Sequence, residues 1–335
     1  MANAKLAAME HLHLIIPDLI LPRDIAPGMQ AELAFIEKML ARAAHTVLPA
    51  CSTEARLCEL FGVASAAPLR AAGDGLEVAG YAWMCADPVE LQRQPAQVMV
   101  RPDVVCTAEE AIAFCELLNA HFVADGISFH APHPQRWYLR LAEIGDVTMP
   151  TLGSAAWGDA REMMPQGRDA VRWRALGNEI QMLLHGHALN QGRLAAGTPP
   201  VSSLWLWGGG RPEGIATVLN AAGGDEPLVT FARAAGMRRF DRLVDMLASD
   251  AKLGVWLATA LQPPMRQYDF YRWREELLAM QRELLQVVWQ ALRDGRLHTL
   301  SLEVPTAEAM HRFDLKAGDR WKVWRRRQPL AVYSV

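Results

Sequence analysis

The stretch His11-Leu12-His13-Leu14-Ile15-Ile16-Pro17-Asp18 decides the fold class of this chain. Its apolar run is short and is stopped by a proline and an aspartate, which predicts a buried strand followed by a turn. Apolar residues then recur at helical spacing over 30–44, which predicts a helix. Strand, loop and helix in this order are typical of the start of an α/β fold.

The patterns beyond this opening also alternate between strand and helix. A loop is expected at 68–80 and a hairpin at 126–130 and 136–141. This alternation favours an α/β fold with a mostly parallel sheet flanked by helices. We expect a single α/β domain over residues 1–335, in which the stretch around 65–165 leaves room for a small cap or insertion. Further strands are predicted at 81–85, 97–101, 204–207 and 297–304, and helices at 54–61, 107–125, 169–187 and 271–293. Thr107, which precedes Glu109 and Glu110, is expected to cap the second of these helices.

The composition limits the classes of partner. About half of the 335 residues are apolar, and eleven tryptophans outnumber nine phenylalanines and five tyrosines. Because a buried indole N–H needs a hydrogen-bond acceptor, several tryptophans are expected to line a site or an interface. The net charge of -3 gives no overall attraction to nucleic acid or anionic lipid, so a small molecule or a protein is the expected partner.

The five cysteines favour a reducing compartment. They are odd in number and form no C-x-x-C pair, which fits neither a disulfide framework nor a zinc knuckle. No segment of the sequence reaches the roughly 18 uncharged apolar residues that a transmembrane helix needs. We therefore expect a cytoplasmic protein with no membrane partner and no nucleic-acid partner.

A polar stripe follows the helix predicted at 169–187. Its members are spaced three and four residues apart, so they share one side of the helix. A solvated stripe more often uses Lys and Glu, whereas these side chains can orient a polar ligand or tie down a neighbouring loop. A buried polar network and a ligand-binding surface both fit the pattern. The stripe contains Arg174, Asn178, Gln181 and His185, and Asn190 and Arg193 follow in the loop expected after the helix.

The segment Ser202-Ser203-Leu204-Trp205-Leu206-Trp207-Gly208-Gly209-Gly210-Arg211-Pro212 ends a strand in three glycines. Glycines let the backbone approach a ligand and expose N–H groups to an anion, and the arginine would add a bidentate clamp. The segment matches neither a Walker A loop nor a dinucleotide-binding turn. An equally weighted alternative is a strained loop framed by packed tryptophan rings. The ligand-binding candidates here are Trp205, Trp207, Gly208, Gly209, Gly210 and Arg211.

Two features near the N-terminus are candidates for metal binding. Asp18 follows the first predicted strand, and α/β sheets bind ligands at the carboxyl ends of their strands. The same aspartate fits a turn after Pro17 equally well. His11 and His13 lie two residues apart on one face of the strand, and metal binding is the less favoured of their interpretations.

Three stretches of the chain resemble the proteobacterial family of the regulatory protein RpfE. They are Trp137-Tyr138-Leu139, Asn178-Glu179-Ile180-Gln181-Met182 and Ser203-Leu204-Trp205-Leu206-Trp207-Gly208-Gly209-Gly210. The resemblance spans nearly the whole chain and implies a regulatory role.

That family is in turn similar to archaeal-type, cofactor-independent phosphoglycerate mutase of the alkaline phosphatase superfamily. The similarity rests on Asp18 and on 207–212 followed by 231–237, and it implies an alkaline-phosphatase-like core. Such mutases hold two divalent metals with Asp and His clusters and carry the phosphate on a serine. Two cations suit this reaction because they stabilise both oxygens of an in-line displacement.

The chain departs from the mutase pattern where the superfamily carries an Asp-His pair. It has His298-Thr299-Leu300-Ser301-Leu302-Glu303 there, which leaves Asp18, Asp269 and His298 as the metal-ligand candidates. Our first hypothesis is therefore a non-catalytic protein that is ligand-binding or regulatory and keeps a degenerate metal site, and its expected ligand is small and polar or phosphorylated. One alternative is an active phosphomutase or phosphatase that uses manganese or zinc on a small phosphate ester. The other is a scaffold that binds a protein partner, so whether the chain is an enzyme stays open.

Overall fold

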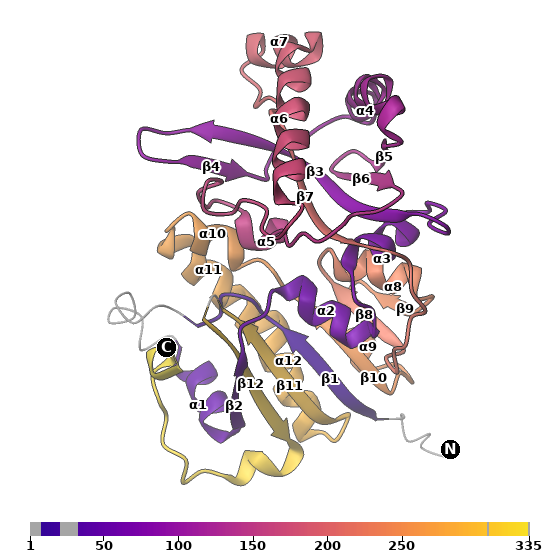
Figure 1. Ribbon diagram of the computed structural model, residues 1–335. Coiled ribbons are helices and arrows are strands. Elements are labelled where there is room, and N and C mark those ends of the chain that lie inside the picture. The colour runs from indigo at the N-terminus through magenta and orange to yellow at the C-terminus, as the bar shows by residue number, and fades with distance from the viewer. Residues whose placement is uncertain (1–7, 21–32, 307, 334–335) are drawn as a thin grey trace. The chain divides into compact units, whose positions relative to one another are not determined.

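The computed structural model describes residues 8–20, 33–306 and 308–333 (Figure 1). The chain divides into two compact units, and each has its own sheet. The first unit contains Met1–Phe61 and Thr217–Val335, and the second contains Gly62–Ala216. The stretch considered for an insertion was 65–165, whereas the second unit continues to residue 216. No helix of the described part is long and apolar enough to cross a membrane.

The first unit is built on a seven-stranded sheet with the order β2-β12-β11-β1-β10-β8-β9. The five strands from β11 to β9 are parallel, and β12 and β2 are antiparallel at one edge. This arrangement confirms the α/β fold with a mostly parallel sheet flanked by helices. The strands are β1 (Met9–Ile15), β2 (Ala44–Pro49), β8 (Ala221–Gly224), β9 (Arg238–Phe240), β10 (Leu253–Leu257), β11 (Leu297–Pro305) and β12 (Ala309–Lys316).

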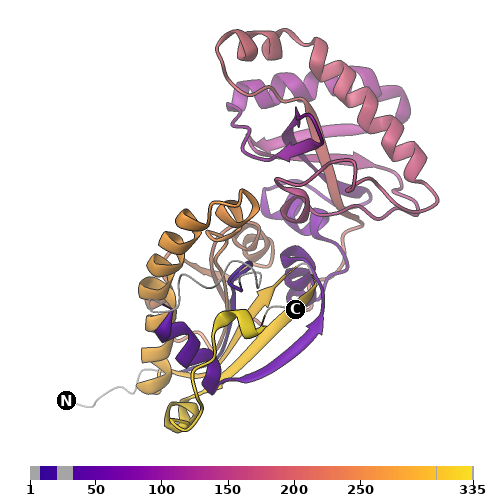
Figure 2. The same ribbon diagram turned by 90° about the vertical axis from the view of Figure 1, so that its left-hand side faces the viewer.

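Helices cover this sheet. The orange segment 270–293 lies along one face of the sheet in Figure 2. The helices are α1 (Ala34–Arg42), α2 (Thr53–Phe61), α8 (Leu228–Ala234), α9 (Leu243–Leu247), α10 (Gln262–Arg266), α11 (Phe270–Met280) and α12 (Gln286–Arg293). A π-helical turn, η3 (Gln281–Leu285), joins α11 to α12, and two 3-10 turns, η4 (Ala317–Trp321) and η5 (Leu330–Tyr333), follow β12.

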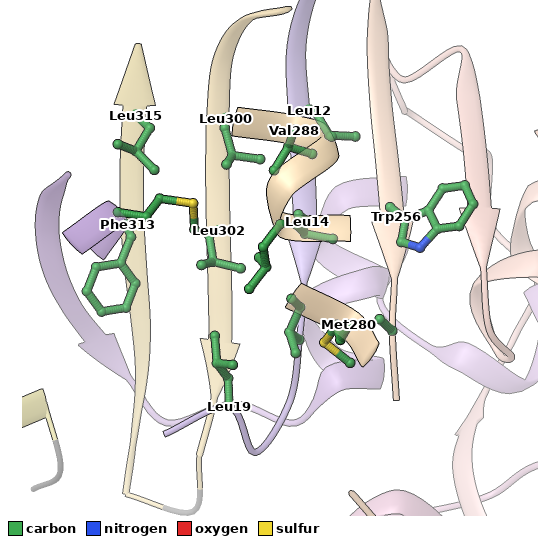
Figure 3. Packing of buried hydrophobic residues seen from close by; sticks show 14 of the residues in the cluster. Leu12, Leu14, Leu19, Trp256, Met280, Val288, Leu300, Leu302, Phe313 and Leu315 are labelled. Carbon is green, nitrogen blue, oxygen red and sulfur yellow. The ribbon is translucent and has the colours of Figure 1, made fainter. Parts of the chain in front are cut away.

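The main core of the first unit lies on one face of its sheet (Figure 3). Side chains alternate between the two faces of a strand, so Leu12 and Leu14 of β1 point to the same side as Leu300 and Leu302 of β11. The apolar sides of α1, α9, α11 and α12 pack against them. The residues that alternate with these leucines along the two strands, including histidines and a glutamate, therefore point to the opposite face.

The second unit has a five-stranded antiparallel sheet in which β3 pairs with β4, β6 and β7, and β5 pairs with β6. Its helices include α4, which begins at the expected capping box of Thr107 and Glu110. The strands are β3 (Ala82–Arg93), β4 (Val98–Arg101), β5 (Ser128–His133), β6 (Arg136–Leu141) and β7 (Ser203–Gly210). The helices are α3 (Ala66–Gly73), α4 (Ala108–Phe122), η2 (Val123–Asp125), α5 (Leu152–Ala155), α6 (Ala170–Gly186) and α7 (Ala188–Ala195).

Several expected elements differ from the structure. The prediction of a loop at 68–80 is wrong over its first half, because α3 continues to Gly73. The alanines of this segment favour a helix. The loop expected after 187 is the helix α7, and the strand expected at 81–85 continues through Pro88 to Arg93. Of the helix expected over 30–44, the part 30–32 lies outside the described residues, and α1 occupies Ala34–Arg42.

Candidate ligand-binding site

A pocket in the second unit lies between α6 and β7. Helix α6 turns Trp173, Leu176, Ile180 and Leu184 towards the interior, at spacings of three and four residues. The next positions around the helix form the wall of a cavity of about 100 Å³. The cavity is lined by Arg174, Asn178 and Gln181 from the helix and by Trp205 from the strand, all of which were predicted as ligand-binding residues.

The remaining walls of the pocket are mostly apolar. Trp205 is held in place because its indole N–H donates a hydrogen bond to the carbonyl of Pro150, at 3.0 Å. A cavity with apolar walls and a few polar groups is typical of small-molecule sites. The further lining residues are Leu91, Met149, Pro150, Ala160, Met163, Met164, Pro165, Trp173, Gly177, Ser203, Leu204 and Leu206.

The polar groups of the pocket are available to a ligand. Within the described part of the chain, the side-chain amides of Asn178 and Gln181 make no hydrogen bond. Arg174 donates from Nε to the carbonyl of Ala170 at 3.3 Å, which leaves its terminal N–H groups for another acceptor. Together these side chains offer a cation, two acceptors and several donors along one edge of the cavity.

The other polar candidates lie outside this pocket, and two of them have structural roles. His185 is exposed near the end of α6. Asn190 is buried and fastens α7 by hydrogen bonds with the carbonyls of Leu184 and Val201 and with the N–H of Val201. Arg193 pairs with Glu110 at 2.8 Å. These contacts of Asn190 and Arg193 fit the interpretation as a buried polar network.

The three glycines of β7 allow close packing. A Cβ atom added to Gly210 would lie 2.0 Å from Oγ of Ser65, and one added to Gly208 would lie 3.1 Å from the Cβ of Ala66. The glycine strand therefore fits against the start of α3. Arg211 donates to the carbonyl of Ala142 at 2.6 Å, and it lines a second pocket, of about 360 Å³.

Trp207 belongs to a buried ionic network that no local sequence pattern predicts. Its indole N–H donates to Oδ2 of Asp87 at 2.8 Å, and the same carboxylate accepts two hydrogen bonds from Arg70. Asp74 accepts hydrogen bonds from Tyr138 and Arg136 nearby on β6. An arginine and an aspartate 17 positions apart form no local sequence pattern, and the strand predicted at 81–85 stops short of Asp87, so the sequence offers no signal for this pair.

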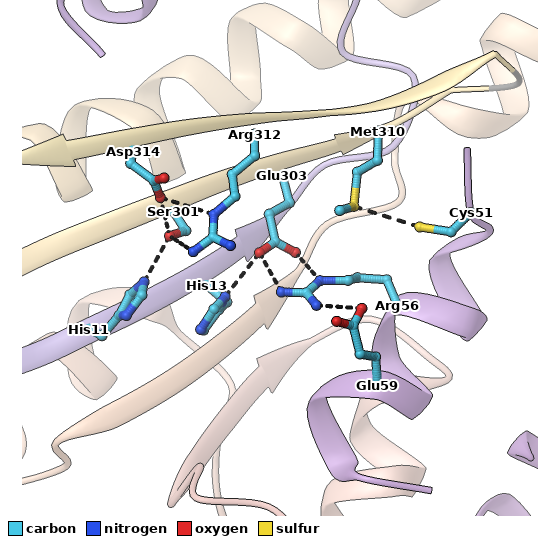
Figure 4. A network of polar contacts seen from close by, with 10 residues as sticks. All are labelled: His11, His13, Cys51, Arg56, Glu59, Ser301, Glu303, Met310, Arg312 and Asp314. Carbon is cyan, nitrogen blue, oxygen red and sulfur yellow. Dashed lines mark hydrogen bonds and ion pairs between the residues drawn. The ribbon is translucent and has the colours of Figure 1, made fainter. Parts of the chain in front are cut away.

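A second polar cluster lies on the sheet face of the first unit that is opposite the leucine core (Figure 4). Glu303 of β11 is fully buried and accepts two hydrogen bonds from Arg56 of α2, at 2.6 and 2.8 Å. His13 of β1 lies 3.0 Å from the same carboxylate. Burial alone would raise the pKa of Glu303, but the hydrogen bonds from His13 and Arg56 outweigh it and lower the pKa to about 2. Glu303 is therefore ionised at neutral pH.

The same cluster fixes the protonation of His11. Ser301 donates its hydroxyl hydrogen to Asp314, so Nε2 of His11, 2.8 Å from the Ser301 oxygen, must be the donor in their contact. Burial, then the charges of His13 and Arg312, lower the pKa of His11 to about 4, and the neutral ring is the dominant form. The rings of His11 and His13 stack with centroids 4.3 Å apart. Because the two rings are stacked, their nitrogens point outward in separate, nearly parallel planes and do not converge on one metal ion.

The three metal-ligand candidates do not form one site. Asp18 lies just beyond β1, with its Oδ2 3.7 Å from Nε of Arg266. Asp269 caps α11 by accepting the N–H of Arg272. His298 is exposed, and the register of β1 and β11 places it at the opposite end of β1, at least about 15 Å from Asp18. Among the described residues no three His, Cys, Asp or Glu side chains form a group suited to a metal.

Comparisons with known proteins identify a shared fold. No family model matches the chain, and neither does any curated protein. The structure is similar to that of the PH0037 protein from Pyrococcus horikoshii, with a TM-score of 0.54 and 12% identity, over 98% of this chain and 93% of that one. It is also similar to cofactor-independent phosphoglycerate mutase from Thermoplasma acidophilum DSM 1728, with a TM-score of 0.37 and 11% identity, over 92% and 90% of the two chains. The first similarity shows a common fold over nearly the whole chain, and the second is too low to carry an argument.

Proposed function

We propose that this protein binds a small molecule in the pocket between α6 and β7 and that it is regulatory, not catalytic. The observation that carries the proposal is the edge formed by Arg174, Asn178 and Gln181 over an apolar cavity of about 100 Å³. One water molecule occupies about 10–15 Å³ of such cavity space, so the cavity has room for several waters or one ring-sized group. The ligand has an apolar part of that size and an anionic or amide-like group that reaches the polar edge.

The geometry near Asp18 supports a loss of mutase chemistry. An in-line phosphoryl transfer between two metals needs several carboxylates and histidines at one place. Here the Arg266 guanidinium lies beside Asp18, while Asp269 is engaged as a helix cap and His298 lies at the other end of the strand. A mutase-like, alkaline-phosphatase-like fold that keeps a binding pocket is consistent with the resemblance to the RpfE family, which we retain as part of the proposal.

Gly177 provides a specific test because it lines the pocket and has open space beside it. A Cβ atom at this position would meet nothing within 4 Å, so Gly177→Leu can fold and place a side chain in the cavity. Gly186 lies on the same helix, outside the pocket, and its Cβ position is equally open. Gly186→Leu is therefore the matched control.

Calorimetric titration with phenyl phosphate, inorganic phosphate and 3-phosphoglycerate tests the proposal. Phenyl phosphate supplies both a ring and an anion, so it should bind most tightly. Gly177→Leu should abolish the binding and Gly186→Leu should leave it unchanged. Asn178→Ala combined with Gln181→Ala should weaken it about thirtyfold, since each of the two lost hydrogen bonds is worth about 1 kcal/mol. Failure of all three compounds to bind, or equal binding by Gly177→Leu, would overturn the proposal.

An active phosphomutase is the alternative function, favoured by the buried Oδ2 of Asp18, which makes no hydrogen bond within the described residues. It is tested by the interconversion of 2- and 3-phosphoglycerate with added manganese or zinc. Turnover that Asp18→Asn abolishes would establish this alternative and reject a purely binding role.

A further inference from the structure

Residues 320–326, which we name the basic-aromatic strap, form an exposed segment after β12, drawn in yellow in Figure 1. Three large apolar side chains on this short segment face solvent. The exposed fractions are 67% for Trp321 and 71% for both Val323 and Trp324. Soluble surfaces normally carry such residues singly, and clusters of them mark interaction sites.

Both ends of the strap are fixed to the first unit. At its start, Arg320 donates a hydrogen bond to the carbonyl of Arg293, at 2.6 Å. Beyond its end, Arg327 pairs with Glu37 of α1, and Leu330 is buried in the core beside that helix. The two tryptophans are therefore held on the outside by anchored neighbours.

The strap also concentrates positive charge. Of its four basic residues, Lys322 is paired with Asp319 at 2.7 Å, and Arg320 lies over the ring of Trp321. Arg325 and Arg326 are exposed, and neither has an ion-pair partner within the described part of the chain. The net charge of -3 averages over this local feature, which is why composition alone predicted no attraction to anionic lipid.

We propose that the basic-aromatic strap binds the surface of an anionic lipid bilayer. Tryptophan rings prefer the headgroup region of a membrane, and exposed arginines there bind lipid phosphates. Exposed Val323 favours a bilayer over a nucleic acid, because an aliphatic side chain offers no base-stacking surface. Peripheral binding of this kind requires no membrane-crossing helix.

The test is cosedimentation of the full chain with vesicles of phosphatidylcholine alone or mixed with phosphatidylglycerol. Binding is expected only to the mixed vesicles and should weaken as salt is raised. Arg325→Ala with Arg326→Ala should lower the affinity about thirtyfold. Trp321→Ala with Trp324→Ala should lower it at least about tenfold and remove the blue shift of tryptophan emission that accompanies binding.

Tyr271→Ala is the matched control, since Tyr271 is an aromatic residue with 69% exposure outside the strap. It should bind vesicles like the wild type, and all variants should keep the wild-type melting temperature. Equal binding to neutral vesicles, or unchanged binding by the tryptophan double variant, would overturn the proposal. So would binding of a single-stranded oligonucleotide in place of vesicles.

Discussion

The guanidinium of Arg70 donates two hydrogen bonds to the carboxylate of Asp87, at 2.9 and 2.6 Å, inside the second unit. The guanidinium carbon also lies 4.9 Å from the ring centre of Tyr138 and 5.1 Å from that of Trp207. Because Arg70 belongs to α3 and its three partners belong to β3, β6 and β7, this one side chain ties the helix to the middle of the sheet.

Arg70→Ala should therefore destabilise the second unit strongly. Both members of the ion pair are buried, and removal of one leaves the carboxylate of Asp87 uncompensated, at a cost of about 3–5 kcal/mol. Urea unfolding followed by tryptophan fluorescence measures the change. Arg168→Ala removes an exposed ion pair with Asp146 and should change the free energy of unfolding by less than about 1 kcal/mol. Equal effects of the two substitutions would contradict the structural role of Arg70.

Local patterns predicted the elements with a strong apolar period or a cap. The strand at 11–16, the capped helix that begins after Thr107 and the helix α6 were found in this way. Strand β2 was missed because most of its residues are exposed, so its sequence shows no alternation. The edge strands of a sheet often lack the pattern that marks its centre.

The polar sites were predictable only in part. Residues on one helix, such as Arg174, Asn178 and Gln181, share a face by their spacing alone, and the structure places all three at one pocket. Arg56 and Glu303 are 247 positions apart, and only the sheet register brings them together. The glycines of β7 also show what a sequence cannot distinguish, since a glycine needed for packing and one needed for a ligand look the same in it.

Gly210→Ala tests which of those two uses applies. The new methyl group would overlap Ser65, so the variant should lose about 1–3 kcal/mol of stability. Ser65→Gly removes the overlapping side chain and should recover much of the loss when the two changes are combined. Urea titrations of the single and double variants measure this coupling. A stable Gly210→Ala variant that has lost ligand binding would instead support a glycine cradle.

The stability of the first unit should fall as the pH drops from about 6.5 to about 4, in part through His11. Its pKa is lowered to about 4 in the folded protein by burial and by the charges of His13 and Arg312, against smaller opposing effects of Asp314 and Glu303. The unfolded chain, with a pKa near 6.5, binds the proton more readily, so protonation favours unfolding over this range. The ring is partly solvated, which limits the contribution to about 1–2 kcal/mol.

His11→Gln should remove this part of the pH dependence. Urea midpoints measured at intervals across the same range, for the wild type and the variant, give the difference in slope. His298→Gln changes an exposed histidine of the same sheet and is the matched control. If both variants keep the wild-type slope, the burial of His11 does not affect the stability in this range.

Asp18 should tolerate asparagine better than alanine. Its φ of 59° lies in the left-handed region, which asparagine adopts more easily than alanine does, and the strain in Asp18→Ala should cost about 1 kcal/mol. Burial raises the pKa of Asp18, with Arg266 offsetting part of the effect, so the ionised form is disfavoured in the folded state. Asp18→Asn removes that cost and should be as stable as the wild type, or more stable, at neutral pH.

Thermal melting with and without manganese tests the alternative in which Asp18 is a metal ligand. A metal ligand would give the wild type a stabilisation by manganese that Asp18→Asn lacks, whereas a binding protein without a metal site should melt at the same temperature with and without the ion.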